Sequence, residues 1–364
     1  MNLGILFGGR SGEHEVSLMS ARSVISVLDK SKYNVIEIGI THQGEWVTGD
    51  DVLDAMSKND TGHLSRVFIL PEPHNALVFQ REVDSNTISP LEKLDVVFPV
   101  LHGSYGEDGT LQGLLEMADL AYVGAGVLGS SVGMDKGLFK DVMRAKGIPV
   151  VDWIISSRAQ VENNLDALIN SAEKLSAYPL FVKPANMGSS VGISKCKNRS
   201  DLMEGILDAA RYDRRILIEK GINAREIEVS VLGNDQPVAS VPGEVIPSDE
   251  FYSYKAKYID GKSGLIIPAE LTPEIGEIIR AIALHTYTAI DCSGMARVDF
   301  LLDKQTSEIF VNEVNTIPGF TSISMYPKLW EASGLSYASL IDRLIELAIE
   351  RKHDRDRIER EYGK

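Results

Sequence analysis

Residues 1–130 alternate short apolar runs with amphipathic stretches, and this rhythm limits the folds open to the chain. Apolar runs cover 3–7, 35–40 and 96–101, and helical patterns cover 16–28 and 111–117. Strands that alternate with helices in this way form βαβ units, in which helices cover a mainly parallel sheet. The pattern therefore predicts an α/β region built on an open, largely parallel sheet.

Two glycine-rich turns follow predicted strands of this sheet. They are Gly-Gly-Arg-Ser-Gly at 8–12 and His-Gly-Ser-Tyr-Gly at 102–106. Because ligands bind at the carboxyl ends of parallel strands, we expect both turns to border a ligand site. His14 and His102 lie at these turns, where a structural hydrogen bond is a more common role than metal binding.

The chain changes character after residue 133. Residues 134–215 contain a helix that opens at Met134-Asp135-Lys136-Gly137, a strand at 180–183 and a long glycine loop, which predicts a smaller α+β domain. Beyond residue 215, four segments alternate as antiparallel strands do, at 216–220, 226–232, 295–302 and 308–315. We therefore expect three domains, 1–133, 134–215 and 216–364, with α/β organisation first and α+β organisation toward the C-terminus.

Composition excludes several classes of protein. With 364 residues and 44% hydrophobic content, the chain can bury a full core, and no apolar run approaches the roughly 20 residues that cross a bilayer. A formal net charge of -15 opposes binding to nucleic acids. The first residues lack the features of a signal peptide. We therefore expect a cytoplasmic protein that binds neither membranes nor nucleic acids.

Two further features favour ordinary structural roles. Cys196 and Cys292 are far apart and have no neighbouring histidines, which indicates reduced thiols rather than a disulfide or a zinc site. The run of charged residues after Ala348 predicts a solvated helix end rather than a binding arm.

A predicted hairpin carries two acids that can face each other. Residues 297–300 and 311–315 alternate polar and apolar side chains, and Gln305-Thr306-Ser307 can turn the chain between them. If Asp299 pairs with Glu313, then Arg297 pairs with Asn315, and all four side chains point to one face. Facing carboxylates repel each other, but a bound magnesium ion with nucleotide phosphates would reverse this effect. A surface hairpin in which Arg297 neutralises both acids is the alternative.

A strand, a lysine and a glycine loop follow one another at 181–192. Lys183 lies within the apolar strand, and the loop is rich in hydroxyl groups and backbone donors, which favours phosphate binding. An ordinary hairpin loop would explain the glycines but not the lysine. The run at 218–226 adds backbone and carboxylate acceptors of the kind that adenine and ribose require.

Taken together, these motifs resemble the ATP-grasp superfamily and, over nearly the whole chain, its D-alanine:D-alanine ligase family. The resemblance rests on four motifs in family order: Gly-Gly-x-Ser-x-Glu-His-Glu-Val-Ser at 8–17, Leu-His-Gly-x-x-Gly-Glu-Asp-Gly-Thr-Leu-Gln-Gly at 101–113, the loop at 183–192, and Asn-Glu-Val-Asn-Thr-x-Pro-Gly-Phe-Thr at 312–321. It implies a three-domain ATP-grasp fold and an ATP-dependent ligase.

The resemblance also implies roles for individual residues. ATP would contact Lys136, Lys183, Ser189, Glu219, Lys220, Ile222, Glu226 and Lys257. Two Mg²⁺ ions, which Mn²⁺ can replace, would bind Asp299, Glu313 and Asn315. The substrate residues would be Glu15, His102, Arg297 and Ser324, and the catalytic residues Glu15, Ser189, Tyr258, Arg297 and Gly319. Lys257 and Tyr258 would belong to a lid loop at about 248–262, and the chain would form a homodimer through its N-terminal region.

The implied reaction joins two D-alanines through an acyl phosphate, releases ADP and phosphate, and supplies a peptidoglycan precursor. Related ligases use D-lactate or D-serine as the second substrate, and Tyr258 resembles the dipeptide-forming enzymes. A different ATP-grasp carboxylate-amine ligase is a second alternative, which the turn with Glu15 disfavours. A nucleotide-binding sensor without turnover is a third, although Lys183, Arg297 and the three metal residues are all present.

Overall fold

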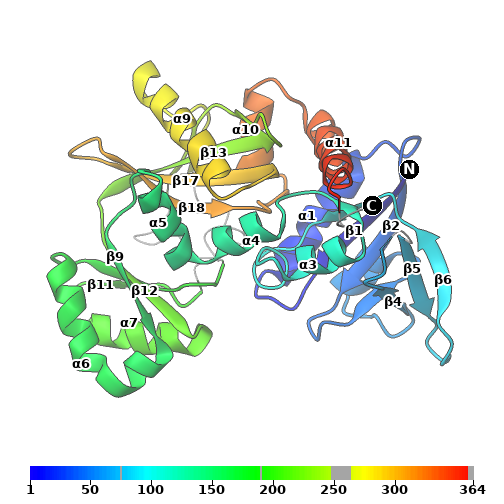
Figure 1. The fold of residues 1–364 in the computed structure, drawn as a ribbon, viewed down its shortest axis with the longest axis horizontal. Helices are drawn as coiled ribbons and strands as arrows, with labels where there is room; N and C mark the ends of the chain where they lie inside the picture. The colour runs from blue at the N-terminus through cyan, green and yellow to red at the C-terminus, as the bar shows by residue number, and fades with distance from the viewer. Residues whose placement is uncertain (74–75, 189–190, 247–263, 360–364) are drawn as a thin grey trace.

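The computed structural model describes residues 1–73, 76–188, 191–246 and 264–359. Three sheets organise this part of the chain, and Figure 1 shows the first and the second at opposite ends of the long axis, with the third between them. The arrangement confirms the α/β fold class predicted from the sequence. The predicted lid at about 248–262, with Lys257 and Tyr258, lies outside the described residues.

The first sheet has eight strands in the order β6-β5-β4-β3-β2-β1-β7-β8. Its parallel part consists of β1 (Asn2–Gly8), β2 (Asn34–Ile40), β7 (Val96–Pro99) and β8 (Ala121–Tyr122). Its antiparallel part adds β3 (Trp46–Thr48), β4 (Ser65–Ile69), β5 (Leu77–Arg81) and β6 (Ser89–Lys93). The prediction of a largely parallel sheet is therefore correct for only half of it, because strands joined by short turns pair antiparallel.

Helices cover this sheet, and the last helix of the chain is one of them. The sheet's own helices are α1 (His14–Val27), α2 (Val52–Ser57) and α3 (Thr110–Met117). One apolar core joins buried residues of β1, such as Phe7, to Leu344 of α11 (Tyr337–Arg355). Figure 1 shows α11, in red, beside the blue N-terminal elements. The C-terminal helix thus stabilises the N-terminal sheet.

The second sheet has four strands in the order β11-β10-β12-β9. They are β9 (Trp153–Ser157), β10 (Leu180–Pro184), β11 (Ser194–Cys196) and β12 (Arg215–Lys220), with α6 (Arg158–Leu175) and α7 (Arg199–Tyr212). The strand predicted at 216–220 therefore belongs here and not to the third sheet. It lies between β9 and β10, where Ile216, Leu217 and Ile218 are all fully buried.

The third sheet follows the order β16-β15-β13-β17-β18, and β14 pairs with β13. Its strands are β13 (Ala224–Gly233), β14 (Val238–Ala239), β15 (Gly243–Ile246), β16 (Gly264–Ile266), β17 (Gly294–Asp303) and β18 (Ile309–Asn315), with α9 (Pro273–Ala289) and α10 (Met325–Ala332). All its pairings are antiparallel, as predicted.

Two short helices link the first sheet to the second. They are α4 (Val127–Met134) and α5 (Lys136–Ala145), which meet at Asp135. The Asp135 carboxylate accepts a hydrogen bond from Leu138 N at 2.9 Å and so caps α5. This cap places Lys136 at the first position of the helix.

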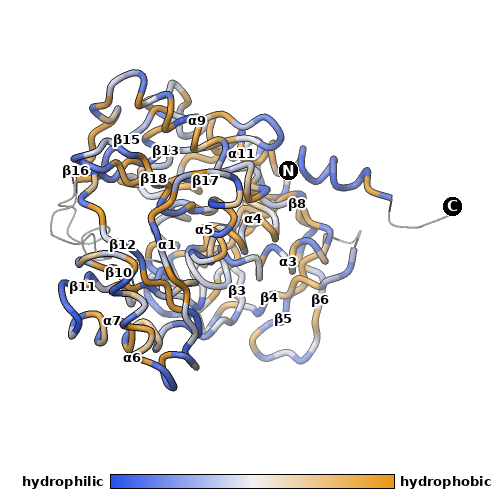
Figure 2. The backbone as a smooth tube through the Cα atoms, turned by 60° about the vertical axis from the view of Figure 1, so that its left-hand side comes forward, coloured by the Kyte–Doolittle hydropathy of each residue, from blue (hydrophilic) through white to orange (hydrophobic). Residues whose placement is uncertain are grey.

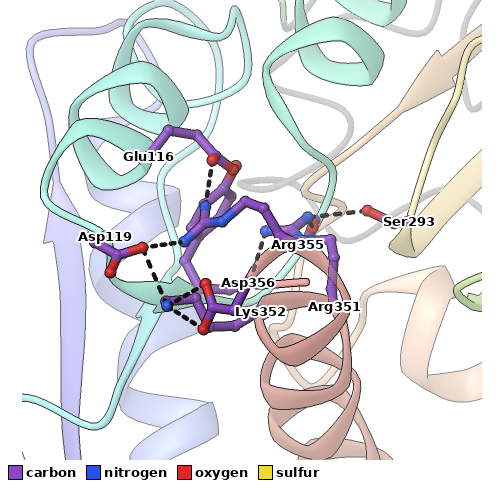
Figure 3. A network of polar contacts seen from close by, with 9 residues as sticks. Glu116, Asp119, Ser293, Arg351, Lys352, Arg355 and Asp356 are labelled. Atoms are coloured by element: carbon purple, nitrogen blue, oxygen red, sulfur yellow. Dashed lines mark hydrogen bonds and ion pairs between the residues drawn. The ribbon is translucent and has the colours of Figure 1, made fainter. Parts of the chain in front are cut away.

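The end of α11 is anchored by a network of charges (Figure 3), here called the C-terminal clamp and made of Glu116, Asp119, Arg351, Lys352, Arg355 and Asp356. Arg351 donates to Tyr122 O at 3.1 Å and to Ser293 Oγ at 2.9 Å, and also to Gly124 O. The predicted solvated helix end is therefore wrong for these residues, because their partners come from distant parts of the sequence.

Beyond the clamp, the polar character of the helix end agrees with its exposure. Figure 2 shows the last turns of α11 mostly in hydrophilic colours. Among the described residues, no helix is long and apolar enough to span a membrane. Cys196 and Cys292 are both buried and free.

Candidate active site

A cavity lies where elements of the three sheets meet. It is lined by both glycine-rich turns, by the α4 to α5 junction, by the loop after β10 and by the end of β18. The lining residues are Glu13, His102, Glu107, Gly133, Met134, Lys136, Met187, Gly188, Ile193, Arg297, Glu313, Val314, Asn315, Thr316, Ile317, Pro318 and Gly319. Several residues selected from the sequence are therefore brought together from distant positions.

The β17 to β18 hairpin has the predicted register. Asp299 pairs with Glu313, and Arg297 pairs with Asn315. A bulge follows at once, because Phe300 pairs with Val311, so the two strands differ by one residue there. The turn is fixed by Asp303, whose carboxylate accepts from the backbone N–H groups of Gln305 and Thr306 at 2.7 and 2.9 Å.

Five side chains on this part of the sheet form what we call the hairpin cluster: Glu228, Arg297, Asp299, Glu313 and Asn315. Arg297 binds Asp299 through two hydrogen bonds of 2.7 Å and lies 3.0 Å from Glu228 Oε2. Asn315 Nδ2 donates to Asp299 Oδ2 at 3.0 Å. Arg297 thus neutralises Asp299, as the surface alternative proposed, but the cluster is part of a cavity wall rather than an exposed face.

Glu313 forms an ion pair with a different cation, Lys136. Lys136 Nζ lies 3.8 Å from Glu313 Oε2 and donates to Met187 O at 2.8 Å. The backbone of Lys136 also donates to Ala185 O at 2.9 Å, which ties the start of α5 to the glycine loop. Lys136 therefore connects the predicted phosphate loop to the predicted metal residues.

A buried group of three charges surrounds Lys183. Its ammonium is paired with Glu219, whose other oxygen lies 3.2 Å from Lys140 Nζ. Burial alone would raise the pKa of Glu219, but the two ammonium groups lower it to about 2. Burial lowers the pKa of Lys140. Burial also opposes the charged form of Lys183, but the charge and hydrogen bond of Glu219 together with the charges of Glu313 and Glu226 raise the pKa of Lys183. This triad has one excess positive charge among the described side chains.

The other predicted nucleotide residues lie beside this triad. Lys220 ends β12 and is exposed, Ile222 is half-buried, and Glu226 is on β13 close enough to act on the charge of Lys183. None of these three lines the cavity described above. The structure therefore groups Glu226 with Lys183 and leaves Lys220 and Ile222 at the crossing between the second and third sheets.

Glu15, the predicted substrate carboxylate, lies outside the cavity, whereas Glu13 lies at its wall. Glu15 lies in the first turn of α1 with its side chain 67% exposed, 3.6 Å from His42 Nε2, and it does not line the cavity. Glu13 does line it. A Cβ atom at Gly103 or at Gly188 would approach Glu13 Oε2 to 2.5 Å, so both glycines are needed to admit this carboxylate. Glu13, rather than Glu15, is therefore the acid that borders the cavity.

His102 and Glu107 fasten the second glycine-rich turn to the loop after β18. His102 Nδ1 donates to Ile317 O at 3.0 Å, and burial lowers its pKa. Glu107 accepts from Gly103 N at 2.8 Å and from Ile317 N at 2.9 Å. Burial, together with the charge of Glu13, raises the pKa of Glu107 to about 8. The geometry gives His102 a positioning role.

Gly319, within the last motif, and Ser324, three residues beyond that motif, lie apart. Gly319 lines the cavity. Ser324 does not line it; the hydroxyl of Ser324 accepts from Thr321 N at 3.0 Å and contacts Thr321 Oγ1 at 2.8 Å. Ser189 lies outside the described residues.

Sequence reasoning missed four residues of these sites. Glu13 and Glu107 belong to the quoted motifs, and their acidic side chains beside glycines were the available signal. Lys140 lies one helical turn after Lys136, and Glu228 shares a strand face with Glu226. The spacing places each pair on one face, but only the packing shows which partners they contact.

The three sheets and the cavity between them define an ATP-grasp ligase fold. Family models described as the D-ala D-ala ligase N-terminus and C-terminus match residues 2–125 and 142–346. The chain therefore belongs to the D-alanine:D-alanine ligase family, as the motifs indicated.

Individual relatives agree with this assignment over nearly their full lengths. A D-alanine--D-alanine ligase of Thermoanaerobacter sp. (strain X514) is 52% identical over 363 residues, 98% of each chain. One of Heliobacterium modesticaldum is 48% identical over 356 residues, 98% of this chain and 96% of that protein. The D-alanine-D-alanine ligase structure from Coxiella burnetii matches with a TM-score of 0.84 and 38% identity, over 98% of this chain and 96% of that one.

Proposed function

We propose that this protein joins two D-alanine molecules to D-alanyl-D-alanine at the expense of ATP. The observation that carries the proposal is the cavity, in which Glu13, Arg297 and Gly319 surround one space beside the acids of the hairpin cluster. Membership of the family supports the same reaction, because relatives about half identical to the chain bear this name.

ATP and a divalent metal fit the charged groups that border the cavity. Lys136 and Lys183 would hold phosphate oxygens, and Glu219 and Glu226, with Lys220 and Ile222, would surround the nucleoside. Asp299, Glu313 and Asn315 offer the hard oxygen donors that Mg²⁺ prefers. When bound, the metal offsets the negative charge of the phosphates. We further propose that two metal ions bind here and that Mn²⁺ can replace Mg²⁺.

Glu13 would bind the ammonium group of the first D-alanine. Its carboxylate lies on the cavity wall between Gly103 and Gly188, and His102 holds the turn that carries Gly103. The contacts of Arg297 with Asp299 and Glu228 fix its guanidinium group at the cavity wall. The substrate is thereby held between an acid and a cation, which orients its carboxylate.

The reaction has two steps. A carboxylate oxygen of the first D-alanine attacks the γ-phosphorus, and ADP leaves, which gives an acyl phosphate. The amine of the second D-alanine then attacks the carbonyl carbon, the amine loses a proton, and phosphate leaves with the electrons of the C–O bond. Arg297 and the backbone N–H of Gly319 would stabilise the oxyanion of this second step. Because water hydrolyses an acyl phosphate, we propose that residues 248–262 close the site.

Several wider properties belong to the same proposal. We propose a homodimer formed through the N-terminal region, a cytoplasmic location and a role in peptidoglycan precursor synthesis. We also propose the domain division at 1–133, 134–215 and 216–364, and the pairing of β12 with β9 and β10 supports extending the second unit to Lys220.

A D-serine-using ligase is the alternative that a comparison raises. The structure titled VanG D-Ala:D-Ser ligase from Enterococcus faecalis matches with a TM-score of 0.84 and 35% identity, over 95% of this chain and 99% of that one. Tyr258 favours D-alanine, and supplying ATP with D-alanine alone decides the question. Dipeptide and phosphate support the proposal. Product only after addition of D-serine or D-lactate contradicts it.

The two neighbouring acids provide a matched test of the site. We expect Glu13→Gln to raise KM for D-alanine by at least about tenfold, because a charged hydrogen bond contributes roughly 1.5–3 kcal/mol. Glu15→Gln should change KM by less than about twofold. Steady-state phosphate release measures both variants, and the reverse ranking would restore Glu15 to the site.

A further inference from the structure

A group of potential metal ligands lies outside the cavity, at the first glycine-rich turn. His14, Glu15 and His42 each offer one ligand atom, and these atoms lie within 4.8 Å of one another. His14 and Glu15 open α1, whereas His42 lies in the connection from β2 to β3. Two chain segments that are distant in sequence therefore present imidazole and carboxylate groups to one point.

The side chains of this group are already in contact. The imidazole rings of His14 and His42 stack with their centroids 3.7 Å apart, and His42 Nε2 lies 3.6 Å from Glu15 Oε1. His14 is buried, while the side chains of His42 and Glu15 are 53% and 67% exposed. One ligand is thus held in place, and the two others have room to turn toward an ion that arrives from solvent.

A hydrogen bond prepares His14 for this role. His14 Nδ1 lies 2.8 Å from Gly9 O. A carbonyl oxygen only accepts, so Nδ1 carries the proton and Nε2 keeps the lone pair. Histidines that bind metals usually donate their other ring N–H to a carbonyl or carboxylate, which fixes the tautomer and the ring orientation.

We propose that His14, Glu15 and His42 form a surface site for a divalent transition-metal ion, with Zn²⁺ as the ion best suited to it. Two imidazoles and one carboxylate form a ligand set that Zn²⁺ uses, with a fourth position left for water. The ligand atoms of a tetrahedral zinc ion lie roughly 3.3 Å apart, given bonds of about 2.0–2.1 Å. Rotation of the exposed His42 and Glu15 side chains would bring the ligand atoms, which lie within 4.8 Å of one another, to this spacing.

This site differs in chemistry from the proposed magnesium site. The hairpin cluster offers oxygen donors, which suit Mg²⁺, whereas imidazole nitrogen favours zinc, copper and nickel ions. The zinc ion would join the connection from β2 to β3 to the start of α1, directly beside Glu13. Zinc binding here therefore does not depend on the reaction proposed for the cavity.

Titration calorimetry of the full chain with Zn²⁺, in excess Mg²⁺, tests the proposal. We expect one zinc equivalent that His42→Ala weakens by at least about tenfold, because even an outer partner of a metal ligand contributes about 10- to 100-fold. His285→Ala removes an exposed histidine of α9 and should leave binding unchanged. Equal isotherms for the unmodified chain and His42→Ala would overturn the proposal.

X-ray absorption of the zinc-loaded, unmodified chain gives a test that needs no variant. The proposal predicts two imidazole ligands with oxygen in the remaining positions. Sulfur ligation, oxygen-only ligation or the absence of retained zinc would overturn it. Folding of the variants is confirmed by circular dichroism, and a variant that fails to fold is replaced by His42→Gln.

Discussion

The hairpin cluster and the C-terminal clamp contain the same types of charged residue but serve different purposes. The clamp sets Arg351, Lys352 and Arg355 against three carboxylates, so its formal charges balance. The hairpin cluster, with Lys136, sets Arg297 and Lys136 against Glu228, Asp299 and Glu313, and Lys136, Arg297, Glu313 and Asn315 line the cavity. A network that joins distant segments holds elements together, whereas one that borders a cavity can offer charge to a ligand.

The contacts of the central arginine also differ between the two clusters. Arg351 directs its donors at backbone carbonyls of the first sheet and lies 4.1 Å over the ring of Tyr122, so its partners are structural. Arg297 lies on the cavity wall and contacts only side chains in the bonds described above. We therefore propose that Arg351 contributes to stability and Arg297 to the reaction.

Replacing Arg297 tests this assignment with the largest effect. We expect Arg297→Ala to lower kcat by about 10²–10³-fold, the usual loss when a donor to a developing oxyanion is removed. ATP affinity should change by less than about threefold, because the proposed nucleotide contacts are made by other residues. Phosphate release and equilibrium binding of an ATP analogue separate the two quantities.

Arg297→Lys is the conservative control for that experiment. It keeps the positive charge but loses the fork that binds Asp299, so activity should recover only in part. Full activity in Arg297→Ala would show that the cavity cation has no part in turnover and would remove the contrast with the clamp.

Replacing Arg351 tests the structural side of the contrast. Arg351→Met keeps apolar contact with Tyr122 but leaves the carbonyls of Tyr122 and Gly124 without this donor, which should cost about 2 kcal/mol of unfolding free energy. Urea unfolding measures the loss. Arg343→Met, on an exposed part of the same helix, should change stability by less than about 0.5 kcal/mol. Equal losses in both variants would show that the clamp has no special role.

The contrast also shows what the sequence could reveal. Alternation along β17 places Arg297 and Asp299 on one face, and the predicted pairing of Asp299 with Glu313 is confirmed. The bulge that makes this pairing possible could not be predicted, because an unbroken register from Leu302 and Ile309 would set Asp299 opposite Asn312. The clamp was not predictable. Arg355 and Glu116 are 239 residues apart, and a run of charges on a helix end gives no sign of a distant partner.

The different positions of Glu13 and Glu15 relative to the cavity have a similar cause. Glu13 and Glu15 are two residues apart at the junction of a turn and a helix, where no simple period relates side-chain direction to position. Packing of α1 on the first sheet decides the matter, because Val16 and Ser17 are buried and Glu15 is thereby turned to solvent. The family motif carried both acids, and only the cavity distinguishes them.

The buried carboxyl group of Glu107, at the cavity, makes the free energy of unfolding depend on pH. With a pKa of about 8 in the folded chain and 4.5 as the ordinary value, Glu107 binds more proton in the folded state between these values. Its contribution to stability is therefore fully present below pH 4.5 and falls as pH rises toward 8, by about 1 kcal/mol per unit. Glu107→Gln should flatten this slope. Urea unfolding of both proteins at several pH values measures the difference, and parallel curves would contradict it.

The smallest expected effect separates charge from hydrogen bonding within the clamp. Lys352 Nζ lies 3.0 Å from Asp119 and 2.5 Å from Asp356, and the side chains of Lys352 and Asp119 are only 17% and 14% exposed. Because solvent screens this pair only in part, Lys352→Ala should lower stability by about 1 kcal/mol, the upper end of the range for exposed pairs, and the difference should shrink in high salt. Urea unfolding at low and high salt measures both effects. A loss as large as that of Arg351→Met would mean that the clamp stabilises the fold through its ion pairs. The clamp would then differ from the hairpin cluster in its charges alone, and not in its contacts with backbone carbonyls.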